Sequence, residues 1–268
     1  INSKVLALKY RPVGFDQLIG QELISETIFN SIKLNKVPNA YLLTGIRGTG
    51  KTSIARIIAK ALNCKNGLEN LCTDNFCENC ESITNSNHID IFELDAASQS
   101  SVENTRELIE FSRYAPTSSN YKIYILDECH MLSKQAWASL LKTLEEPPEY
   151  LKFIFATTEI KKVPITIVSR CQRFDLSRIN SEELFQFVKK ISVKEQGRVT
   201  DDALKLIVRL SEGSVRDALS LLDRGLLSNS EGEELDLTKA QKIYGYFDKS
   251  SLIELFQNLF KGNENEVI

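Results

Sequence analysis

The chain has 268 residues, of which 42% are hydrophobic and 26% charged, so it can bury a substantial core and is neither disordered nor fibrous. Lysine and arginine number 33 against 36 aspartate and glutamate, and the net charge of −3 excludes binding to nucleic acid through a strong overall positive charge. No stretch approaches the length of a membrane span and the N-terminus is too polar for a secretory signal, so we expect a soluble intracellular protein without a membrane partner.

A phosphate-binding loop is the first informative element. A short apolar strand begins at Tyr41, and a helix with apolar residues at helical spacing follows from Ile54. Between them GIRGTGKT fits G-x-x-x-x-G-K-[ST], in which backbone N–H groups wrap phosphates, the lysine reaches the β- and γ-phosphates and the hydroxyl binds Mg²⁺. The alternative is an ordinary glycine-rich turn, which the flanking strand and helix disfavour. The predicted nucleotide-binding residues are Gly45, Ile46, Arg47, Gly48, Thr49, Gly50, Lys51 and Thr52, with Thr52 also binding magnesium.

A cysteine cluster follows that helix. Its members are Cys64, Cys72, Cys77 and Cys80. Four thiolates suit tetrahedral zinc and leave no open position, so the ion would be structural. Disulfides and free thiols are the alternatives, but a reducing compartment disfavours disulfides, and C-x-x-C with two nearby cysteines is typical of zinc sites. We predict a zinc insert at about residues 64–80 and simple packing roles for the remaining cysteines, Cys129 and Cys171.

Three further strands are predicted at His88–Asp95, Lys122–Asp127 and Lys152–Thr158, with helical segments between them. Strands that alternate with helices predict an α/β fold whose largely parallel sheet is covered on both faces. Asp127 ends an apolar strand, where an acid would help to hold Mg²⁺, and Glu128 is the candidate base for the attacking water. The alternative is that the two acids merely cap a helix that begins near Ser133.

The last third of the chain is predicted to be helical. Strand-like runs stop after Arg173, and three helical stretches follow, with helix starts near Asn180 and Thr200. An acidic linker is predicted at 228–237, and another helical region begins at Thr238. The chain lacks an initial Met and ends within a helical pattern, so we expect it to be part of a longer protein. The predicted domains are residues 1–178, 179–229 and 230–268.

Taken together, these motifs resemble the AAA+ ATPases, and within them the gamma/tau-type clamp-loader subunits of bacterial DNA polymerase III. The resemblance covers residues 4–230. It rests on KYRPVGFDQLIGQ from Lys9, DECHMLSKQAWASLLKTLEEPP from Asp127, FIFATT from Phe153, SRC from Ser169 and GSVRDALSLLD from Gly213. It implies an AAA+ core, a zinc module, a helical lid at 179–229 and the start of a helical collar. It also implies that ATP, Mg²⁺ and structural Zn²⁺ are bound, and that a sliding clamp is loaded onto primed DNA.

The resemblance assigns roles to single residues. Arg11 lies in the segment that closes over adenine. Thr158 matches the residue that senses the γ-phosphate and positions water, with Thr157 as an alternative. Arg216 resembles a second sensor from the lid, and Arg170 resembles an arginine finger that acts on the neighbouring subunit. The family's zinc module lies at this point of the chain, although the C-x₄-C gap that ends at Cys77 is longer than its common C-x-x-C.

The same resemblance implies partners and a cytoplasmic location in a bacterium. The partners would be other subunits of a hetero-pentamer, the sliding clamp, primer–template DNA, and the polymerase through regions beyond this chain. Ser98, Gln99, Ser100 and Ser101 would contact DNA phosphates, the alternative being a well-capped surface helix. Two other functions stay open: a different AAA+ DNA motor, for branch migration or helicase loading, and a non-hydrolysing scaffold subunit.

Overall fold

A computed structural model describes residues 5–98, 110–229, 233–246 and 260. The chain forms two compact units, each considered by itself. The larger unit comprises Ala7–Asn180 together with the short segment Ser214–Arg216, and the smaller one contains Ser181–Gly213 and the chain from Asp217 onward. Among the described residues, no helix combines the length and the apolarity needed to cross a membrane.

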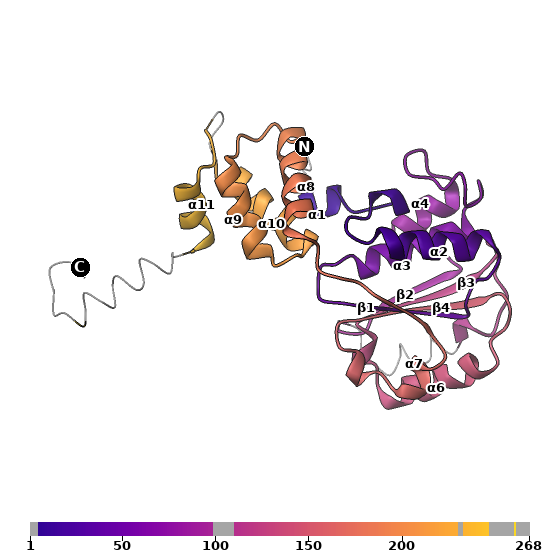
Figure 1. The fold of residues 1–268 in the computed structure, drawn as a ribbon. Helices are drawn as coiled ribbons and strands as arrows, with labels where there is room; N and C mark the ends of the chain where they lie inside the picture. The colour runs from indigo at the N-terminus through magenta and orange to yellow at the C-terminus, as the bar shows by residue number, and fades with distance from the viewer. Residues whose placement is uncertain (1–4, 99–109, 230–232, 247–259, 261–268) are drawn as a thin grey trace. The chain divides into compact units, whose positions relative to one another are not determined.

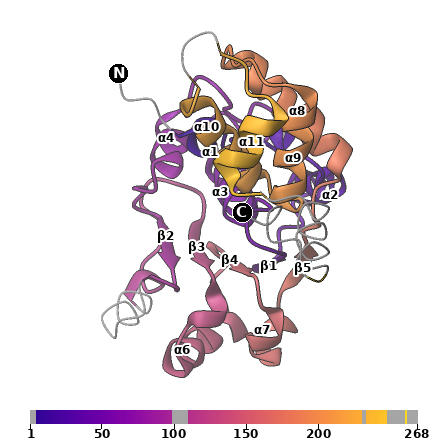
Figure 2. The same cartoon turned by 90° about the vertical axis from the view of Figure 1, so that its left-hand side faces the viewer.

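The larger unit is built on a sheet of five parallel strands in the order β2-β3-β4-β1-β5 (Figure 2). The strands are β1 (Ala40–Thr44), β2 (Ile91–Asp95), β3 (Lys122–Asp127), β4 (Leu151–Thr157) and β5 (Gln172–Asp175). The three central strands are continuous apolar runs because helices cover both of their faces. The predicted α/β fold with a parallel sheet is therefore confirmed.

Two details of the strand prediction are wrong. The strand predicted at His88–Asp95 begins only at Ile91, because His88–Asp90 form a turn in which the N–H of Ile91 donates to the carbonyl of His88 at 3.1 Å. The sequence analysis also missed β5, which spans the point where strand-like runs were predicted to stop. Only Phe174 of β5 is buried, since the strand lies at the edge of the sheet, and an exposed edge strand lacks the apolar run that identifies its neighbours.

Helices pack on both faces of this sheet (Figure 1). One face carries α2 (Glu22–Lys33), α3 (Lys51–Asn63) and α4 (Glu78–Thr84), and the other carries α6 (Lys134–Glu145) and α7 (Ile165–Val168). Side chains of β1 alternate between the two: Tyr41 and Leu43 join the core beneath α3, whereas Leu42 joins the core beneath α6. The remaining short elements are α1 (Leu6–Lys9), η1 (Phe15–Gln17), η2 (Cys129–Met131) and η3 (Ile160–Lys162).

The helical part consists of α8 (Ser181–Lys194), α9 (Asp201–Ser211), α10 (Val215–Leu227) and α11 (Leu237–Tyr244). The predicted start at Thr200 is confirmed, because its hydroxyl accepts the N–H of Ala203 at 3.3 Å. Leu235, near the end of the predicted linker, is fully buried beside Val199 and thus packs within the helical unit. The domain boundaries themselves stay predictions.

Candidate nucleotide site

The phosphate loop lies between β1 and α3, as its sequence predicts. Gly50 precedes the first residue of α3 with φ +98°, a left-handed conformation that strains any residue with a Cβ atom. Gly48 has φ +80°, and a Cβ atom there would lie only 2.0 Å from Oγ of Ser214, which belongs to the same compact unit. Both glycines are therefore required by the backbone. The loop leaves the first N–H groups of α3 available to an anion.

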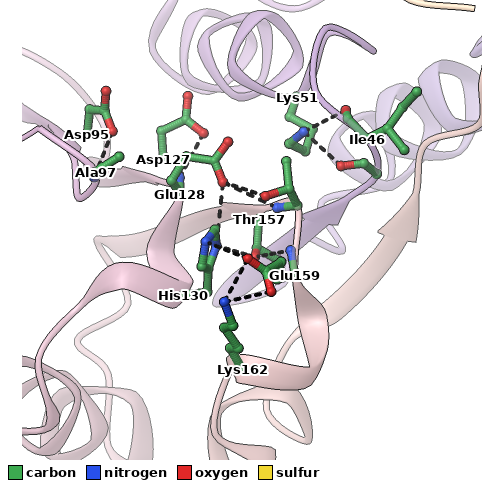
Figure 3. Close-up of polar contacts among 12 residues, drawn as sticks. Ile46, Lys51, Asp95, Ala97, Asp127, Glu128, His130, Thr157, Glu159 and Lys162 are labelled. Atoms are coloured by element: carbon green, nitrogen blue, oxygen red, sulfur yellow. Dashed lines mark hydrogen bonds and ion pairs between the residues drawn. The ribbon is translucent and has the colours of Figure 1, made fainter. Parts of the chain in front are cut away.

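Lys51 is buried within this loop, with 5% of its surface exposed. Its Nζ donates to the carbonyl oxygens of Gly45 at 2.9 Å and of Ile46 at 2.8 Å (Figure 3). Burial lowers the pKa of Lys51, whereas the carboxylates of Glu128 and Asp127 oppose that shift. The ammonium group is thus held at the loop, beside acids from a different strand.

A side-chain hydrogen bond joins the two halves of the site. The hydroxyl of Thr52 on α3 donates to Oδ2 of Asp127 at the end of β3. The other oxygen of Asp127, Oδ1, accepts the N–H of Glu128 at 2.9 Å. A hydroxyl and a carboxylate that meet in this way offer the oxygen ligands that Mg²⁺ prefers, so the residues fit the predicted ion.

The ionised carboxyl of Asp127 destabilises the folded state, so the stability of the protein should depend on pH. Burial raises the pKa of its carboxyl above the ordinary 3.8, although the hydrogen bond from Thr52 opposes the shift. The folded state therefore loses stability as the pH rises from that value through the raised pKa. We expect Asp127→Asn to raise the unfolding temperature without nucleotide at about pH 8, and this gain to disappear near pH 4. Differential scanning calorimetry at both pH values measures it, and an equal gain at both would contradict this cause.

Glu128 and Thr158 are brought together from adjacent strand ends. Oε2 of Glu128 accepts the hydroxyl of Thr158 at 2.9 Å. The alternative residue, Thr157, is fully buried and faces His130 instead, at 2.9 Å from Nδ1.

Ser133 caps α6 by accepting the N–H of Ala136, so the idea that Asp127 and Glu128 cap this helix is wrong.

His130 was not identified by the sequence analysis. It lies in the turn after β3 and contacts both Glu128 and Glu159 (Figure 3). The only sequence signal was its place two residues after the candidate base, because its contacts with Thr157 on β4 and with Glu159, just before η3, are set by the fold.

Two of the predicted arginines, Arg216 and Arg11, have contacts with the phosphate loop or with the helix that follows it. A Cβ atom on Gly48 would lie 3.4 Å from Cβ of Arg216. Nε of Arg11 donates to Oγ of Ser53 on α3 at 3.3 Å, and burial, followed by the charge of Arg56, lowers the pKa of Arg11. These positive charges would be stabilised by a bound phosphate chain.

Arg170 and Arg47 are placed differently. The guanidinium of Arg170 donates to the carbonyl of Thr166 at 2.7 Å and pairs with Glu145 at 3.3 Å, both on the face of α6 and α7. Arg170 is exposed, and none of these contacts involves the phosphate loop of its own chain. Arg47 is exposed at the tip of the loop, and the hydroxyl of Thr49 donates to the carbonyl of Ile46 at 2.9 Å.

The four predicted cysteine ligands gather at one point. Sγ atoms of Cys64, Cys72, Cys77 and Cys80 all lie within 4.8 Å of one another, and those of Cys64 and Cys72 are 3.6 Å apart. Tetrahedral zinc with Zn–S bonds of about 2.3 Å would place sulfur atoms about 3.8 Å apart, so the set fits such an ion. Burial opposes ionisation of Cys77, but N–H groups of Cys80 and Lys65 lower its pKa to about 7. The longer C-x₄-C gap thus does not separate the ligands.

A buried lysine accompanies this cluster. Nζ of Lys60 donates to the carbonyl oxygens of Cys72 and Val13, each at 2.8 Å, and Lys60 is 1% exposed. Burial lowers the pKa of Lys60, whereas the four cysteines oppose that shift, as negative charge on their sulfur atoms would. Cys129 and Cys171 pack beneath α6 and α7, as predicted. Of the predicted DNA-contacting residues, Ser98 lies in the turn after β2, where its N–H donates to the carbonyl of Asp95 at 3.2 Å, and Gln99, Ser100 and Ser101 lie outside the described residues.

Comparisons with known proteins agree with this geometry. The family described as "DNA polymerase III, delta subunit" matches residues 20–180, and the family described as "DNA polymerase III clamp loader subunit, ATPase lid domain" matches residues 184–228. Among solved structures, the Holliday junction branch migration motor RuvB of Thermotoga maritima aligns with a TM-score of 0.64 and 20% identity, over 93% of this chain and 79% of that one. That likeness shows the fold alone.

Curated relatives are more similar in sequence. DNA polymerase III subunit gamma/tau of Mycoplasma genitalium is 44% identical over 264 residues, which are 98% of this chain and 44% of that protein. Subunit tau of Escherichia coli is 39% identical over 265 residues, which are 99% of this chain and 41% of that protein. The chain therefore spans less than half the length of these relatives. Because the family matches cover both the core and the lid, the chain belongs to the AAA+ clamp-loader subunits of DNA polymerase III.

Proposed function

We propose that this chain is the nucleotide-binding part of an ATP-hydrolysing motor subunit of the bacterial DNA polymerase III clamp loader. The observation that carries the proposal is the hydrogen bond between Thr52 and Asp127, which joins the phosphate loop to the acidic strand end. Lys51 lies at the same point, held by loop carbonyls. An intact set of this kind favours hydrolysis over a scaffold role.

In this proposal, the residues of the site have different roles in ATP hydrolysis. Lys51 and the N-terminus of α3 bind the phosphates. Thr52 and Asp127 would hold Mg²⁺, which offsets negative charge on the phosphates when it is bound. Glu128 accepts a proton from water as the water oxygen attacks the γ-phosphorus and the bond to the β–γ bridging oxygen breaks, which yields ADP and phosphate.

The surrounding polar residues support that step. Thr158 orients Glu128 and the water, while Arg216 of the same chain stabilises charge on the γ-phosphate. Arg170 serves the site of a neighbouring subunit, in keeping with its exposure and with its contacts on another part of the surface. A complete site then requires assembly, and ATP binding and hydrolysis are coupled to the neighbouring subunit.

Membership of the clamp-loader family supports a proposal on the partners. We infer a hetero-pentamer with other loader subunits that opens the sliding clamp, places it on primer–template DNA and contacts the polymerase through regions beyond this chain. Such a protein acts in the bacterial cytoplasm. Because the net charge is −3, DNA affinity should come from several subunits together and decrease steeply with salt.

The proposed function is tested by the ATPase rate of the full-length subunit assembled with its partners, with and without clamp and primed DNA. We expect the rate to rise only when all components are present, and Lys51→Ala to abolish the part contributed by this subunit. An ATPase rate in the complete assembly that is unaffected by Lys51→Ala would favour a scaffold role. Duplex unwinding by the chain alone would favour a different DNA motor.

We also propose that the four cysteines hold a structural zinc ion. The closeness of their sulfur atoms supports this, as does the positive charge of Lys60 beside them. Four protein ligands fill a tetrahedral zinc, so the ion would stabilise the fold and take no part in hydrolysis.

Replacing one ligand tests the zinc site. We expect the full-length subunit to contain one zinc ion, and Cys80→Ser to lose it and to lower the unfolding temperature by several degrees. Cys171→Ser is the matched control, because Cys171 lies outside the cluster, and it should keep the metal. Elemental analysis and calorimetry measure the two effects. A wild-type subunit without zinc, or zinc retained by Cys80→Ser, would contradict the proposal.

A further inference from the structure

The imidazole of His130 lies between two carboxylates beside the nucleotide site (Figure 3). Its Nδ1 is 3.4 Å from Oε2 of Glu128, and its Nε2 is 3.6 Å from Oε1 of Glu159. The side chain of His130 is 6% exposed, compared with 26% for Glu128 and 49% for Glu159. The ring is therefore an internal group that reaches toward the candidate base from below the surface.

The backbone directs the ring toward Glu128. Glu128 has φ +46°, a left-handed conformation that turns the chain sharply at the end of β3. The N–H of Met131 then donates to the carbonyl of Glu128 at 2.9 Å, which closes a turn around Cys129. Cys129 is fully buried beneath α6 and anchors that turn in the core. The fold therefore brings His130 back under Glu128.

The same ring nitrogen, Nδ1, is also held by a residue of β4. Nδ1 shares a hydrogen bond of 2.9 Å with the hydroxyl of Thr157, a fully buried residue at the end of β4. The same hydroxyl accepts the N–H of Glu159 at 3.0 Å. Lys162 in turn donates to Oε1 of Glu159 at 2.8 Å. Thr157, Glu159 and Lys162 thus restrict His130 to one orientation.

In contrast, the contacts that the described residues make with the carboxylate of Glu128 involve one oxygen only. Among the described residues, its contacts with Thr158 and His130 all involve Oε2: 2.9 Å from the hydroxyl of Thr158, 3.4 Å from the N–H of Thr158 and 3.4 Å from Nδ1 of His130. Support on Oε2 leaves Oε1 to accept a proton. A general base works only if it is held within hydrogen-bond reach of the proton it removes.

We propose that His130 is a positioning residue for ATP hydrolysis, which holds the Glu128 carboxylate so that it can accept the proton of the attacking water. This inference rests on the proposed ATPase function. Thr158 and His130 support the same oxygen from two different elements, the end of β4 and the turn after β3. Without His130, Glu128 keeps a single support and, being partly exposed, can rotate toward solvent.

The first test replaces the ring in the full-length subunit within the assembled loader. We expect His130→Phe to lower kcat by about 10- to 100-fold, since small displacements of a catalytic group cost up to about 10²-fold. The dissociation constant for ATP should not change. His88→Phe is the matched control, because His88 is the other histidine of the chain. It is also buried, and its ring accepts the N–H of Asp90 at 3.0 Å. The His88→Phe variant should be less stable than the wild type and should keep the wild-type kcat.

Two further measurements separate positioning from a merely structural role. His130→Asn places an amide nitrogen near the position of Nδ1 and should recover part of the lost kcat, whereas His130→Gln reaches toward Nε2 and should recover less. In a Glu128→Gln background, His130→Phe should lower kcat no further, because a residue that acts through Glu128 has no effect once Glu128 is replaced. If His130→Phe does not fold, Thr157→Val removes the hydroxyl that holds the ring and should give a smaller kcat loss.

The outcomes distinguish this inference from the proposed function. If hydrolysis depends on Lys51 but His130→Phe, or Thr157→Val in its place, keeps the wild-type kcat, the inference is wrong and the ATPase function stands. An additional loss of kcat in the Glu128→Gln background would also overturn it. If the assembled wild-type complex does not hydrolyse ATP at this subunit, both the function and the inference are wrong.

Discussion

Glu128→Gln is expected to lower kcat for ATP hydrolysis in the assembled loader by about 10²- to 10⁴-fold, the range typical of a general base. The amide cannot accept the proton of water, but it can still accept the hydrogen bond from Thr158 through its oxygen. Nucleotide binding should be retained, because Lys51 and Thr52 are unchanged. The altered subunit should therefore bind ATP and fail to hydrolyse it.

Single-turnover hydrolysis and equilibrium ATP binding, measured on the same preparation, test this expectation. Glu69→Gln is a suitable control, because Glu69 is an exposed acid that pairs with Lys33 on α2. A hydrolysis rate in Glu128→Gln within a factor of about 3 of wild type would exclude Glu128 as the base.

Arg170→Ala is expected to have the second large effect, and on a different subunit. An arginine finger contributes about 10³- to 10⁵-fold to phosphoryl transfer, so a site that depends on Arg170 should become nearly inactive. The subunit that carries the substitution should still bind ATP normally, because Arg170 contacts Thr166 and Glu145 rather than its own phosphate loop. Stability should change little, since its ion pair is exposed.

Mixed assemblies separate an effect on the neighbour from an effect within the chain. Hydrolysis should be lost in the subunit next to the one that carries Arg170→Ala. ATP binding by the subunit that carries the substitution should stay at the wild-type level. Arg173→Ala is the matched control: Arg173 is similarly exposed, at 47% compared with 36% for Arg170, and pairs with Asp175. Equal losses for the two variants, or no loss for Arg170→Ala, would contradict an arginine-finger role.

Features that depend on local spacing were predictable from the sequence. The phosphate loop requires glycines at fixed positions beside Lys51 and Thr52, so its pattern is continuous along the chain. The central strands are recognisable because burial on both faces makes them uninterrupted apolar runs. The four cysteines were identified by residue type and proximity, and their sulfur atoms do gather.

Other features depended on how the strands pair. The choice between Thr157 and Thr158 turned on which side chain faces Glu128, and adjacent residues of one strand end point in opposite directions. His130 lies in η2, and its contacts with Thr157 at the end of β4 and with Glu159 just after it form only in the folded sheet.

The sequence by itself therefore indicated the kinds of chemical group: the phosphate loop and the acidic pair of the nucleotide site, and the separate set of four cysteines. The tertiary structure decided their partners, namely that Thr52 contacts Asp127 and that Thr158 and His130 contact Glu128. The physical reason is that the strand order β3-β4-β1 brings together chain segments that lie far apart in sequence. Such pairing is set by the packing of the whole sheet, and no local pattern specifies it.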